Sequence, residues 1–525
     1  MKASELLVKC LENEGVEYIF GIIGKEVIDI ADSLANSKIT YIPVRHEQGA
    51  AFMADVYGRV SGKPAVCLTT LGPGATNLVT GVASAKLDHS PLIAIVGQKG
   101  QGSQHQSAHQ YIDLVKIFEP AVKWSVSVKD ANTIPEIVRS GFRIAKREKP
   151  GPVVMEVPEN IASAHAVSMP LPIADLGKSI PLSDEFEKAV KLLNESNRPF
   201  IVVGNGAIRM NAISELQAFI EKVKCPVTTS FMAKGILPKG HPQNYYTFGF
   251  NEKDYALRGI EESDLLVVIG FDHVEKLPAE WNLKKVQVLH IDGLPAEVDE
   301  GYPVKAELVG DIKEILKALG QFEIVAKPWQ PEANLQKRIE EAFSIEPIMS
   351  EKSSLTIENV IHSVEKLQTE ATIVISDVGS HKVSIARTYQ PLHARQLIIS
   401  NGLASMGISI PGAIGAKLAS PEKTVICITG DGGALMNFAE LETAKRIGVP
   451  FVVIVLNDAM LKIEDEMMKQ NFGESYGVTF SNPDFLQLAQ AFGIKGYRPG
   501  TTQEFETNLA EAILSNEIAL LDVKI

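Results

Sequence analysis

Oxygen-bearing residues follow two consecutive apolar runs in the last third of the chain. The turn Gly430-Asp431-Gly432-Gly433 comes directly after one run, and Asn457 follows the next. Because neighbouring parallel strands end at the same edge of a sheet, Asp431 and Asn457 should lie side by side there. With the backbone carbonyl of Ala459 and two phosphate oxygens, they would nearly complete the octahedron that Mg²⁺ prefers. The spacing therefore predicts a site for Mg²⁺ and a diphosphate group.

The same turn would also bind the diphosphate directly. Gly430 to Gly433 stands between an apolar run and a helical pattern, so free N–H groups and the positive end of a helix would face the ligand. No Gly-Lys-Ser or Gly-Lys-Thr follows, which excludes a P-loop. A Gly-Asp-Gly triplet alone is most often an ordinary turn, and Asn457 at the next strand end makes the pattern specific.

Parallel α/β sheets must position these residues. Apolar runs rich in β-branched residues alternate with helical patterns along the whole chain, for example at 92–97, 265–270 and 424–429. Two proline-rich segments without clear periodicity, 165–183 and 321–355, are typical of linkers. We therefore expect an α/β protein of three Rossmann-like or flavodoxin-like units with parallel sheets, at residues 1–165, 184–320 and 355–525.

The first and third of these units share a pattern. The apolar run and glycine turn at 66–74 are followed by a helical stretch and a second apolar run at 91–96, and 425–433 is followed by 450–455 at the same spacing. The match indicates duplicated topology, although any two βαβ units look alike to some degree.

Composition excludes several classes of protein. The 525 residues include 51 Lys and Arg against 64 Asp and Glu, a net charge of -13, so binding to nucleic acid over a broad surface is not expected. No apolar run reaches the length of a membrane span, and the first residues read as an amphipathic helix and not as a signal peptide. The four cysteines form no CxxC pair, which favours reduced thiols in a cytoplasmic protein.

The stretch from Gly430 to Asn457 resembles the signature of thiamine diphosphate enzymes. The runs Arg45 to Ala51, Leu71 to Asn77 and Ser400 to Gly407 resemble further motifs of the 2-oxo acid group in that family, so the resemblance spans the chain. It implies that the three units are pyrimidine-binding, central and diphosphate-binding domains, and that thiamine diphosphate and Mg²⁺ are the cofactors.

The resemblance also implies roles for single residues. Glu47 would hydrogen-bond N1' of the cofactor and favour the imino form, so that the 4'-amino group can take the C2 proton; without the resemblance, Glu47 reads as a charge at a helix start. Met406 would be the apolar wedge under the bent cofactor. Without the resemblance, Met406 reads as a core methionine. Asp431, Asn457 and Ala459 would bind the metal. The other expected cofactor contacts are Gly379, Ser380, His381, Ala404, Gly430, Gly432, Gly433, Met460 and Leu461.

Within the family, the chain is most similar to acetolactate synthases of the catabolic, flavin-independent kind. The runs Gly270 to Glu275, His290 to Asp292 and Phe480 to Phe485 carry this likeness. It implies decarboxylation of pyruvate and addition of the resulting hydroxyethyl enamine to a second pyruvate, giving 2-acetolactate. Gln110 matches a glutamine on the substrate side; its other interpretation is a loop amide that serves only turn hydrogen bonds.

Further expectations concern partners and flavin. Because Glu47 lies in the first unit and Asp431 in the third, the family arrangement predicts a homodimer or homotetramer whose sites join two subunits. The run Phe271 to Glu275 replaces the one found in flavin-binding relatives, and the glycines at 204 and 206 are weak evidence for a dinucleotide, so FAD is not expected.

Two other functions remain open for the chain. One is a non-oxidative 2-oxo acid decarboxylase that releases an aldehyde, and the other, from another class, is a non-catalytic scaffold or regulatory subunit.

Overall fold

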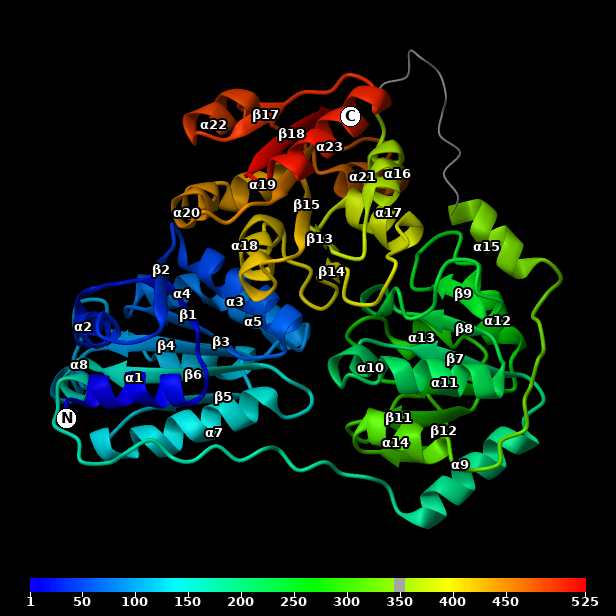
Figure 1. The fold of residues 1–525 in the computed structure, drawn as a ribbon, viewed down its shortest axis with the longest axis horizontal. Helices are drawn as coiled ribbons and strands as arrows, with labels where there is room; N and C mark the ends of the chain where they lie inside the picture. The colour runs from blue at the N-terminus through cyan, green and yellow to red at the C-terminus, as the bar shows by residue number, and fades with distance from the viewer. Residues whose placement is uncertain (344–354) are drawn as a thin grey trace.

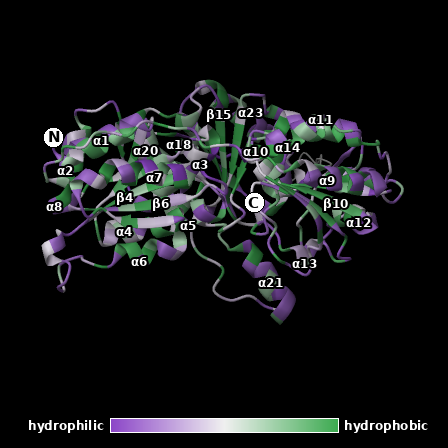
Figure 2. Ribbon diagram, turned by 90° about the horizontal axis from the view of Figure 1, so that it is seen from below, coloured by the Kyte–Doolittle hydropathy of each residue, from purple (hydrophilic) through white to green (hydrophobic). Residues whose placement is uncertain are grey.

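Three parallel sheets of six strands each organise the chain. The computed structural model describes residues 1–343 and 355–525. Figure 1 shows the first and central units side by side, with the third unit above them. Apolar residues concentrate in the strands, whereas the outer helices carry the hydrophilic residues (Figure 2). The predicted α/β class with three parallel sheets is confirmed.

The first sheet has the strand order β2-β1-β3-β4-β6-β5. Its strands are β1 (Tyr18–Ile22), β2 (Thr40–Pro43), β3 (Ala65–Thr69), β4 (Leu92–Gln98), β5 (Trp124–Ser127) and β6 (Pro152–Pro158). Its α-helices are α1 (Ala3–Asn13), α2 (Ile28–Leu34), α3 (Glu47–Ser61), α4 (Pro73–Asn77), α5 (Val79–Leu87), α6 (Leu114–Phe118), α7 (Ile134–Lys146) and α8 (Glu159–Ala162). The short 3-10 turns are η1 (Lys25–Val27), η2 (Gln101–Ser103), η3 (Glu119–Ala121) and η4 (Ala131–Thr133).

The central sheet has a different order, β12-β11-β10-β7-β8-β9. Its strands are β7 (Pro199–Val203), β8 (Val227–Thr229), β9 (Asn244–Thr247), β10 (Leu265–Ile269), β11 (Val288–Asp292) and β12 (Val304–Val309). The helices are α9 (Ser183–Glu195), α10 (Gly206–Arg209), α11 (Ile213–Val223), α12 (Ala256–Glu262), α13 (Pro278–Trp281), α14 (Ile312–Leu319) and α15 (Leu335–Phe343), with η5 (Phe231–Ala233). This is the strand order of the Rossmann fold, in which β7 and β10 lie at the centre and the chain runs outward from each of them to one edge of the sheet.

The third sheet has the order β14-β13-β15-β16-β18-β17. Its strands are β13 (Thr372–Ser376), β14 (Leu397–Ile399), β15 (Thr424–Gly430), β16 (Val452–Asn457), β17 (Lys495–Tyr497) and β18 (Ala519–Lys524). The helices are α16 (Ile357–Leu367), α17 (Ser380–Thr388), α18 (Ser409–Ala419), α19 (Asp431–Asn437), α20 (Glu440–Ile447), α21 (Lys462–Phe472), α22 (Phe485–Ala491) and α23 (Thr502–Ser515). Counted along each unit, its order equals that of the first sheet, so the duplicated topology inferred from spacing is confirmed.

The two proline-rich segments differ from each other. Residues 166–182 contain no helix or strand and run along the outside from the first unit to the central one (Figure 1). The segment 321–355 was predicted as a linker, but it contains α15, whose Leu335, Ile339 and Phe343 pack into the core of the central unit. The linker expectation was wrong there because these residues recur at helical spacing. Residues 344–354 of the segment lie outside the described residues.

The first and third units share one hydrophobic core. Helix α3 packs along α18, and the buried cluster around them takes residues from both units. Gly415 allows this approach, since a Cβ at that position would lie 2.2 Å from the carbonyl oxygen of Met53 on α3. The first unit is therefore held directly on the third.

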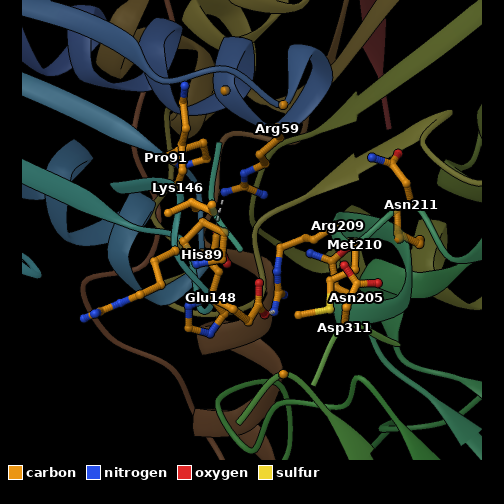
Figure 3. A pocket seen from close by; sticks show the side chains of 18 of the residues that line it. Arg59, His89, Pro91, Lys146, Glu148, Asn205, Arg209, Met210, Asn211 and Asp311 are labelled. Carbon is orange, nitrogen blue, oxygen red and sulfur yellow. Dashed lines mark hydrogen bonds and ion pairs between the residues drawn. The ribbon is translucent and has the colours of Figure 1, made fainter. Parts of the chain in front are cut away.

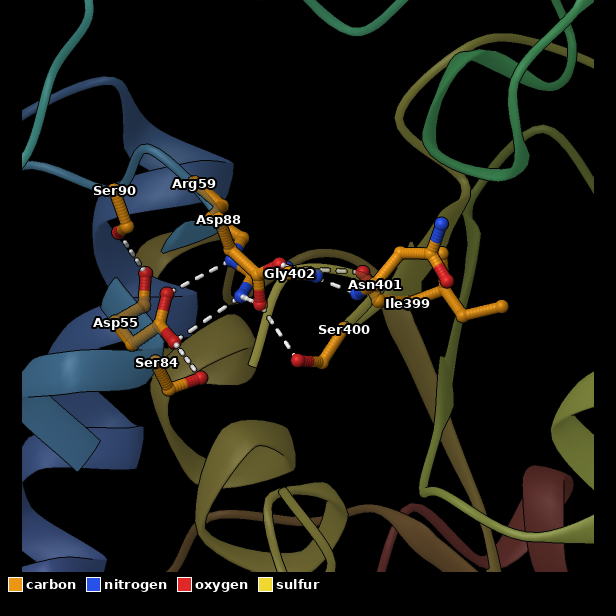
Figure 4. A network of polar contacts seen from close by, with 9 residues as sticks. All are labelled: Asp55, Arg59, Ser84, Asp88, Ser90, Ile399, Ser400, Asn401 and Gly402. Carbon is orange, nitrogen blue, oxygen red and sulfur yellow. Dashed lines mark hydrogen bonds and ion pairs between the residues drawn. The ribbon is translucent and has the colours of Figure 1, made fainter. Parts of the chain in front are cut away.

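A buried ionic network reinforces this contact (Figure 4). The Arg59 guanidinium, whose side chain is 9% exposed, donates to Asp55 at 2.8 and 3.1 Å, to Asp88, and to the Ile399 carbonyl at 3.0 Å. Asp88 in turn accepts hydrogen bonds from the hydroxyl of Ser400 at 2.6 Å and from two backbone N–H groups, those of Asn401 and Gly402. One carboxylate thus anchors a loop of the third unit on the first.

The remaining sequence expectations concern single features. All four cysteines are buried and free, and the amphipathic N-terminal helix is α1. Among residues 1–343 and 355–525, no helix is long and apolar enough to cross a membrane.

Replacing Asp88 should weaken the contact between the first and third units. We expect Asp88→Ala to cost about 3–5 kcal/mol of stability, because Arg59 stays buried with one carboxylate in place of two. Differential scanning calorimetry would show the thermal midpoint fall. Lys9→Ala removes an exposed ion pair with Glu5 and should leave the midpoint unchanged. An equal midpoint for Asp88→Ala and the unaltered protein would contradict this role.

Candidate functional site

The third sheet brings Asp431 and Asn457 to one edge. Strands β15 and β16 are parallel neighbours, with Gly430 opposite Leu456, so the two residues that follow stand next to each other. Asp431 is 2% exposed and Asn457 4%. The expectation that these two side chains meet at neighbouring strand ends agrees with the structure.

The Asp431 carboxylate is held by hydrogen bonds from three backbone N–H groups. Its Oδ1 accepts from Gly432 at 2.7 Å, and its Oδ2 accepts from Asp458 at 3.1 Å and Ala459 at 2.7 Å. Ala459 has a φ of 58°, the left-handed conformation that turns the chain back over the strand end. Its carbonyl accepts one hydrogen bond, from the Phe480 N–H at 3.0 Å, and a carbonyl oxygen has a second lone pair for a metal.

Asn457 is oriented by a residue that the sequence analysis missed. Its Nδ2 donates to Asp522 Oδ1 at 2.8 Å, which turns its Oδ1 away from Asp522. Asp522, on β18, is fully buried, and its Oδ2 accepts from Arg498 Nε at 2.9 Å. Register between β16 and β18 creates this contact, and an Asp inside the otherwise apolar run Ala519 to Val523 was the available signal.

Asn482 is the second residue that the sequence analysis missed. It lies in the run Phe480 to Phe485, which resembles acetolactate synthases, but the sequence analysis assigned it no role. Its Nδ2 donates to Asp431 Oδ2 at 2.7 Å and to Asn457 Oδ1 at 3.0 Å. One amide nitrogen therefore bridges the two expected side-chain ligands of the metal.

His381 lies against the glycine turn with one ring nitrogen unpartnered. It is 3% exposed, and a Cβ at Gly430 would lie 3.6 Å from its Cε1. Within the described residues its Nε2 has no hydrogen-bond partner, and burial lowers its pKa, so the imidazole is neutral near pH 7. Gly379 (φ 148°) and Ser380 begin the helix that carries it. In the tautomer with the proton on Nε2, this buried nitrogen can donate to an anionic oxygen that arrives with a ligand.

Apolar side chains flank the turn on its other side. A Cβ at Gly432 would lie 3.3 Å from Met406 Cε, 3.5 Å from Phe480 Cζ and 3.8 Å from Leu461 Cδ2. Met406, Leu461 and Phe480 thus converge beside the predicted diphosphate site. Met460 pairs with Thr479 in an isolated β-bridge, which fixes the segment that contains Leu461.

Asp377 fixes the loop that contains Met406. It is fully buried at the end of β13, and it accepts from the N–H groups of Gly407 at 2.9 Å and Ser409 at 3.1 Å and from the Ser409 hydroxyl at 2.6 Å. Ala404, in the same loop, has a φ of 52°. The Asp88 contacts described above hold the beginning of this loop and Asp377 holds its end.

Glu47 lies on the first unit as the first residue of α3. It is 6% exposed, and its Oε2 accepts from Asn77 Nδ2 at 2.9 Å. Within the described part of one chain, no hydrogen bond or ion pair joins Glu47 to Asp431, Asn457 or His381. The backbone beside it does contact the third unit, since the N–H groups of Arg45 and His46 donate to Glu440 at 3.0 and 2.9 Å.

Gln110 lies exposed in the same unit, with a φ of 61°. A Cβ at Gly72 would come within 2.8 Å of its carbonyl oxygen, so its segment packs over the glycine turn after β3. Its side chain makes no hydrogen bond to the described residues.

A large cavity lies elsewhere. It has a volume of about 1030 Å³ and lies between the first and central units, with residues of the third unit such as Arg395 and Ile399 also lining it, and no predicted cofactor residue does so. Figure 3 shows Arg59, His89 and Glu148 of the first unit facing Arg209 and Asn211 of the central one. We place the candidate site at the third sheet because the polar groups of the predicted site converge there.

Among residues 1–343 and 355–525, no cluster of three His, Cys, Asp or Glu could hold a metal. The expected magnesium site has only one carboxylate, that of Asp431, so it would not form such a cluster.

Three family models match consecutive parts of the chain. The model described as thiamine pyrophosphate enzyme, N-terminal TPP binding domain, matches residues 1–117. The central domain model of the same enzymes matches residues 186–319, and their C-terminal TPP binding domain model matches residues 377–523.

Curated relatives match over the full length. The probable acetolactate synthase large subunit of Methanocaldococcus jannaschii is 35% identical over 100% of this chain and 92% of its own length. The acetolactate synthase large subunit of Haemophilus influenzae is 33% identical over 100% of this chain and 94% of its own, and the acetolactate synthase of Bacillus subtilis is 29% identical over 100% and 93%.

His381 should contribute to diphosphate affinity. We expect His381→Phe to weaken the binding of magnesium pyrophosphate at least about tenfold, because a hydrogen bond to a charged group contributes about 1.5–3 kcal/mol. Isothermal titration calorimetry measures the affinity. The exposed His393 supplies the control variant His393→Phe, which should bind as the unaltered protein does. Unchanged affinity in His381→Phe would exclude a contact between His381 and the diphosphate.

Proposed function

Because this chain belongs to the thiamine pyrophosphate enzymes, in their acetolactate synthase group, we propose that it joins two molecules of pyruvate into 2-acetolactate and releases CO₂. It is an acetolactate synthase-like carboligase that depends on thiamine diphosphate. The observation that carries this function is the full-length match to acetolactate synthases, in a chain that contains Glu47, Asp431 and Asn457.

The third unit would hold the diphosphate end of the cofactor. Asp431, Asn457 and the Ala459 carbonyl are the proposed Mg²⁺ ligands, and oxygen ligands of this kind suit that ion. The unpartnered Nε2 of His381 and the N–H groups of the glycine turns would bind the phosphates. The further contacts are proposed for Gly379, Ser380, Ala404, Met406, Gly430, Gly432, Gly433, Met460 and Leu461.

The first unit would activate the cofactor. When bound, thiamine diphosphate supplies the carbon nucleophile and the electron sink for decarboxylation. Glu47 would hold a proton at N1' of the pyrimidine, and its hydrogen bond from Asn77 fixes the carboxylate for that purpose. Gln110, on the loop over Gly72, would contact the 2-oxo acid. Met406, Leu461 and Phe480 would exclude water beside the diphosphate.

Two subunits would be needed for one site. Within the described residues of one chain no hydrogen bond or ion pair joins Glu47 to Asp431. Because the family resemblance implies that the first and third units meet across subunits, we propose a homodimer or homotetramer in which Glu47 of one subunit faces Asp431 of the next. Residues 1–165 would then be the pyrimidine-binding domain and residues 355–525 the diphosphate-binding domain, with residues 184–320 between them.

We propose that the reaction uses no FAD. The glycines at 204 and 206, which could indicate a dinucleotide, have another reason in this fold. A Cβ at Gly206 would lie 2.7 Å from the Cα of Gly270, and a Cβ at Gly204 would lie 2.3 Å from the Cα of Phe271. These glycines allow two backbone segments to touch, so they carry no evidence for a phosphate.

A cytoplasmic location of the protein also stays a prediction.

The product formed from pyruvate tests the function. With thiamine diphosphate and Mg²⁺, we expect acetolactate, detected as acetoin after acid treatment, and we expect Glu47→Gln to abolish turnover while the cofactor still binds, because the variant lacks the carboxylate at N1'. Acetaldehyde as the sole product would favour the decarboxylase. Cofactor binding without any product from pyruvate would favour a scaffold or regulatory subunit.

Mixed subunits test the shared site. Neither Glu47→Gln nor Asp431→Asn should be active alone, but a mixed dimer has one site with both native residues. After equal mixing by unfolding and refolding, half of the dimers are mixed and half of their sites are intact, so we expect about a quarter of the unaltered activity. Refolded unaltered enzyme is the reference. If each site lay within one chain, the mixture would stay inactive.

A further inference from the structure

A buried ion pair lies at the carboxyl edge of the first sheet, outside the residues assigned so far. Lys99 Nζ donates to Glu26 Oε1 at 2.9 Å, and Glu26 Oε2 accepts from the Thr70 hydroxyl at 2.8 Å. The side chain of Glu26 is 4% exposed and that of Lys99 15%. A buried ion pair often contributes no more stability than apolar side chains of the same size, so folding alone does not account for this one.

The ion pair lies near the residue proposed to bind the pyrimidine. Strands β1, β3 and β4 are neighbours, and Glu26, Thr70 and Lys99 follow their carboxyl ends. A Cβ at Gly74 would lie 2.9 Å from Thr70 Cγ2 and 3.3 Å from Glu47 Oε1. Thr70 therefore contacts Glu26 on one side and approaches Glu47 on the other.

The proposed contact of the 2-oxo acid, Gln110, lies at the same edge. Its carbonyl packs over Gly72, in the turn after β3. Gln98, directly before Lys99, donates to the Ile112 carbonyl at 3.0 Å, which ties the segment of Gln110 to the end of β4. The first unit thus brings Lys99 next to the loop that would contact the substrate.

The Lys99 ammonium has donors left for a further partner. It has three N–H groups, and within residues 1–343 and 355–525 it makes one hydrogen bond, to Glu26. Lys25 and Arg45, which also lie near this edge, are exposed, and Arg45 pairs with Glu442 of the third unit at 3.8 Å. Lys99 is therefore a cation fixed beside the proposed substrate site, with capacity to bind an anion.

The two pyruvates of the proposed reaction place different demands on such a cation. The first loses CO₂ as its C1–C2 bond breaks, its C2 bonds to C2 of the second, and the ketone oxygen of the second takes up a proton. A cation on the first carboxylate would stabilise the charge that must disappear as neutral CO₂ leaves, and so would slow that step. The second pyruvate keeps its carboxylate in the product, so a cation can bind and orient it throughout.

We propose that Lys99 binds the carboxylate of the second pyruvate, and that Glu26 is the positioning residue that fixes the Lys99 ammonium. Thr70 holds Glu26 in turn. Lys99 would favour an acceptor that carries a carboxylate over a neutral aldehyde, and would direct the protein toward carboligation and away from aldehyde release. This inference rests on the proposed function, because that function requires a second pyruvate.

The products formed with a charged and a neutral acceptor test this role. With pyruvate alone, we expect Lys99→Met to form acetolactate about 10–100-fold more slowly, because a hydrogen bond to a charged group is lost, and to release acetaldehyde in its place. With added acetaldehyde, which has no carboxylate, acetoin formation should fall far less. Proton NMR without acid treatment distinguishes the three products. Glu26→Gln should change the ratio of acetolactate to acetoin in the same direction, but less.

Two double variants separate this role from folding. Lys99→Met combined with Glu26→Gln leaves no unpaired buried charge, so it should keep a higher thermal midpoint than Lys99→Met alone and still lose acetolactate to the same extent. Glu17 and Lys63 form a pair of the same length, 2.9 Å, at the amino ends of β1 and β3. As the matched control, Glu17→Gln combined with Lys63→Met should change neither the products nor the midpoint, since this pair is exposed.

The outcomes distinguish this inference from the proposed function. If the unaltered protein forms no acetolactate from pyruvate with thiamine diphosphate and Mg²⁺, both fall. If it forms acetolactate, but Lys99→Met and its double variant keep the ratio of acetolactate to acetoin, only the role of Lys99 is overturned. Equal losses of acetolactate and acetoin would place Lys99 at the first pyruvate or in the fold alone, and would also overturn its assignment to the acceptor.

Discussion

The buried carboxylate of Asp431 is the interaction on which the edge of the third sheet depends. A negative charge removed from water costs free energy unless donors replace the lost hydration. No cationic side chain of the described residues pairs with it; three backbone N–H groups and the Asn482 amide do so instead. These donors come from the turn after β15, from the end of β16 and from the loop before α22. One charge therefore fixes three segments, including the left-handed Ala459.

The first and third units share one topology, but they present different residues for the two ends of one cofactor. The first and third sheets have the same strand order, but the turn after β3 reads Leu71-Gly72-Pro73-Gly74 and contains no carboxylate, whereas the turn after β15 contains Asp431. The first unit offers Glu47 at a helix start instead. A cofactor with a diphosphate at one end and a pyrimidine at the other can be held by such a pair, because each unit presents only one kind of group.

The sequence predicted what depends on local pattern, and it missed contacts between distant segments. Alternating apolar runs and glycine turns were enough for three parallel sheets and for the meeting of Asp431 with Asn457, because neighbouring parallel strands end together. The strand order of the central sheet, which differs from that of the other two, was not predicted, since strand order depends on crossover connections. Asp522, Asn482 and Asp88 were missed because each finds its partner across a strand register, a loop pairing or a unit boundary. The role of His381 came from resemblance, while its unpartnered nitrogen is visible only in three dimensions.

The packing of α3 on α18 has a consequence for how the chain is made. About 350 residues separate the end of α3 from the start of α18, so at roughly 5–20 residues per second the ribosome needs on the order of a minute to supply the partner helix. During that time the face of α3 that later enters the shared core has nothing to cover it. Contacts of such sequence separation also slow folding. Biosynthesis should therefore pass through a stage in which the first unit exposes apolar surface, and a chaperone would protect the nascent chain at that stage.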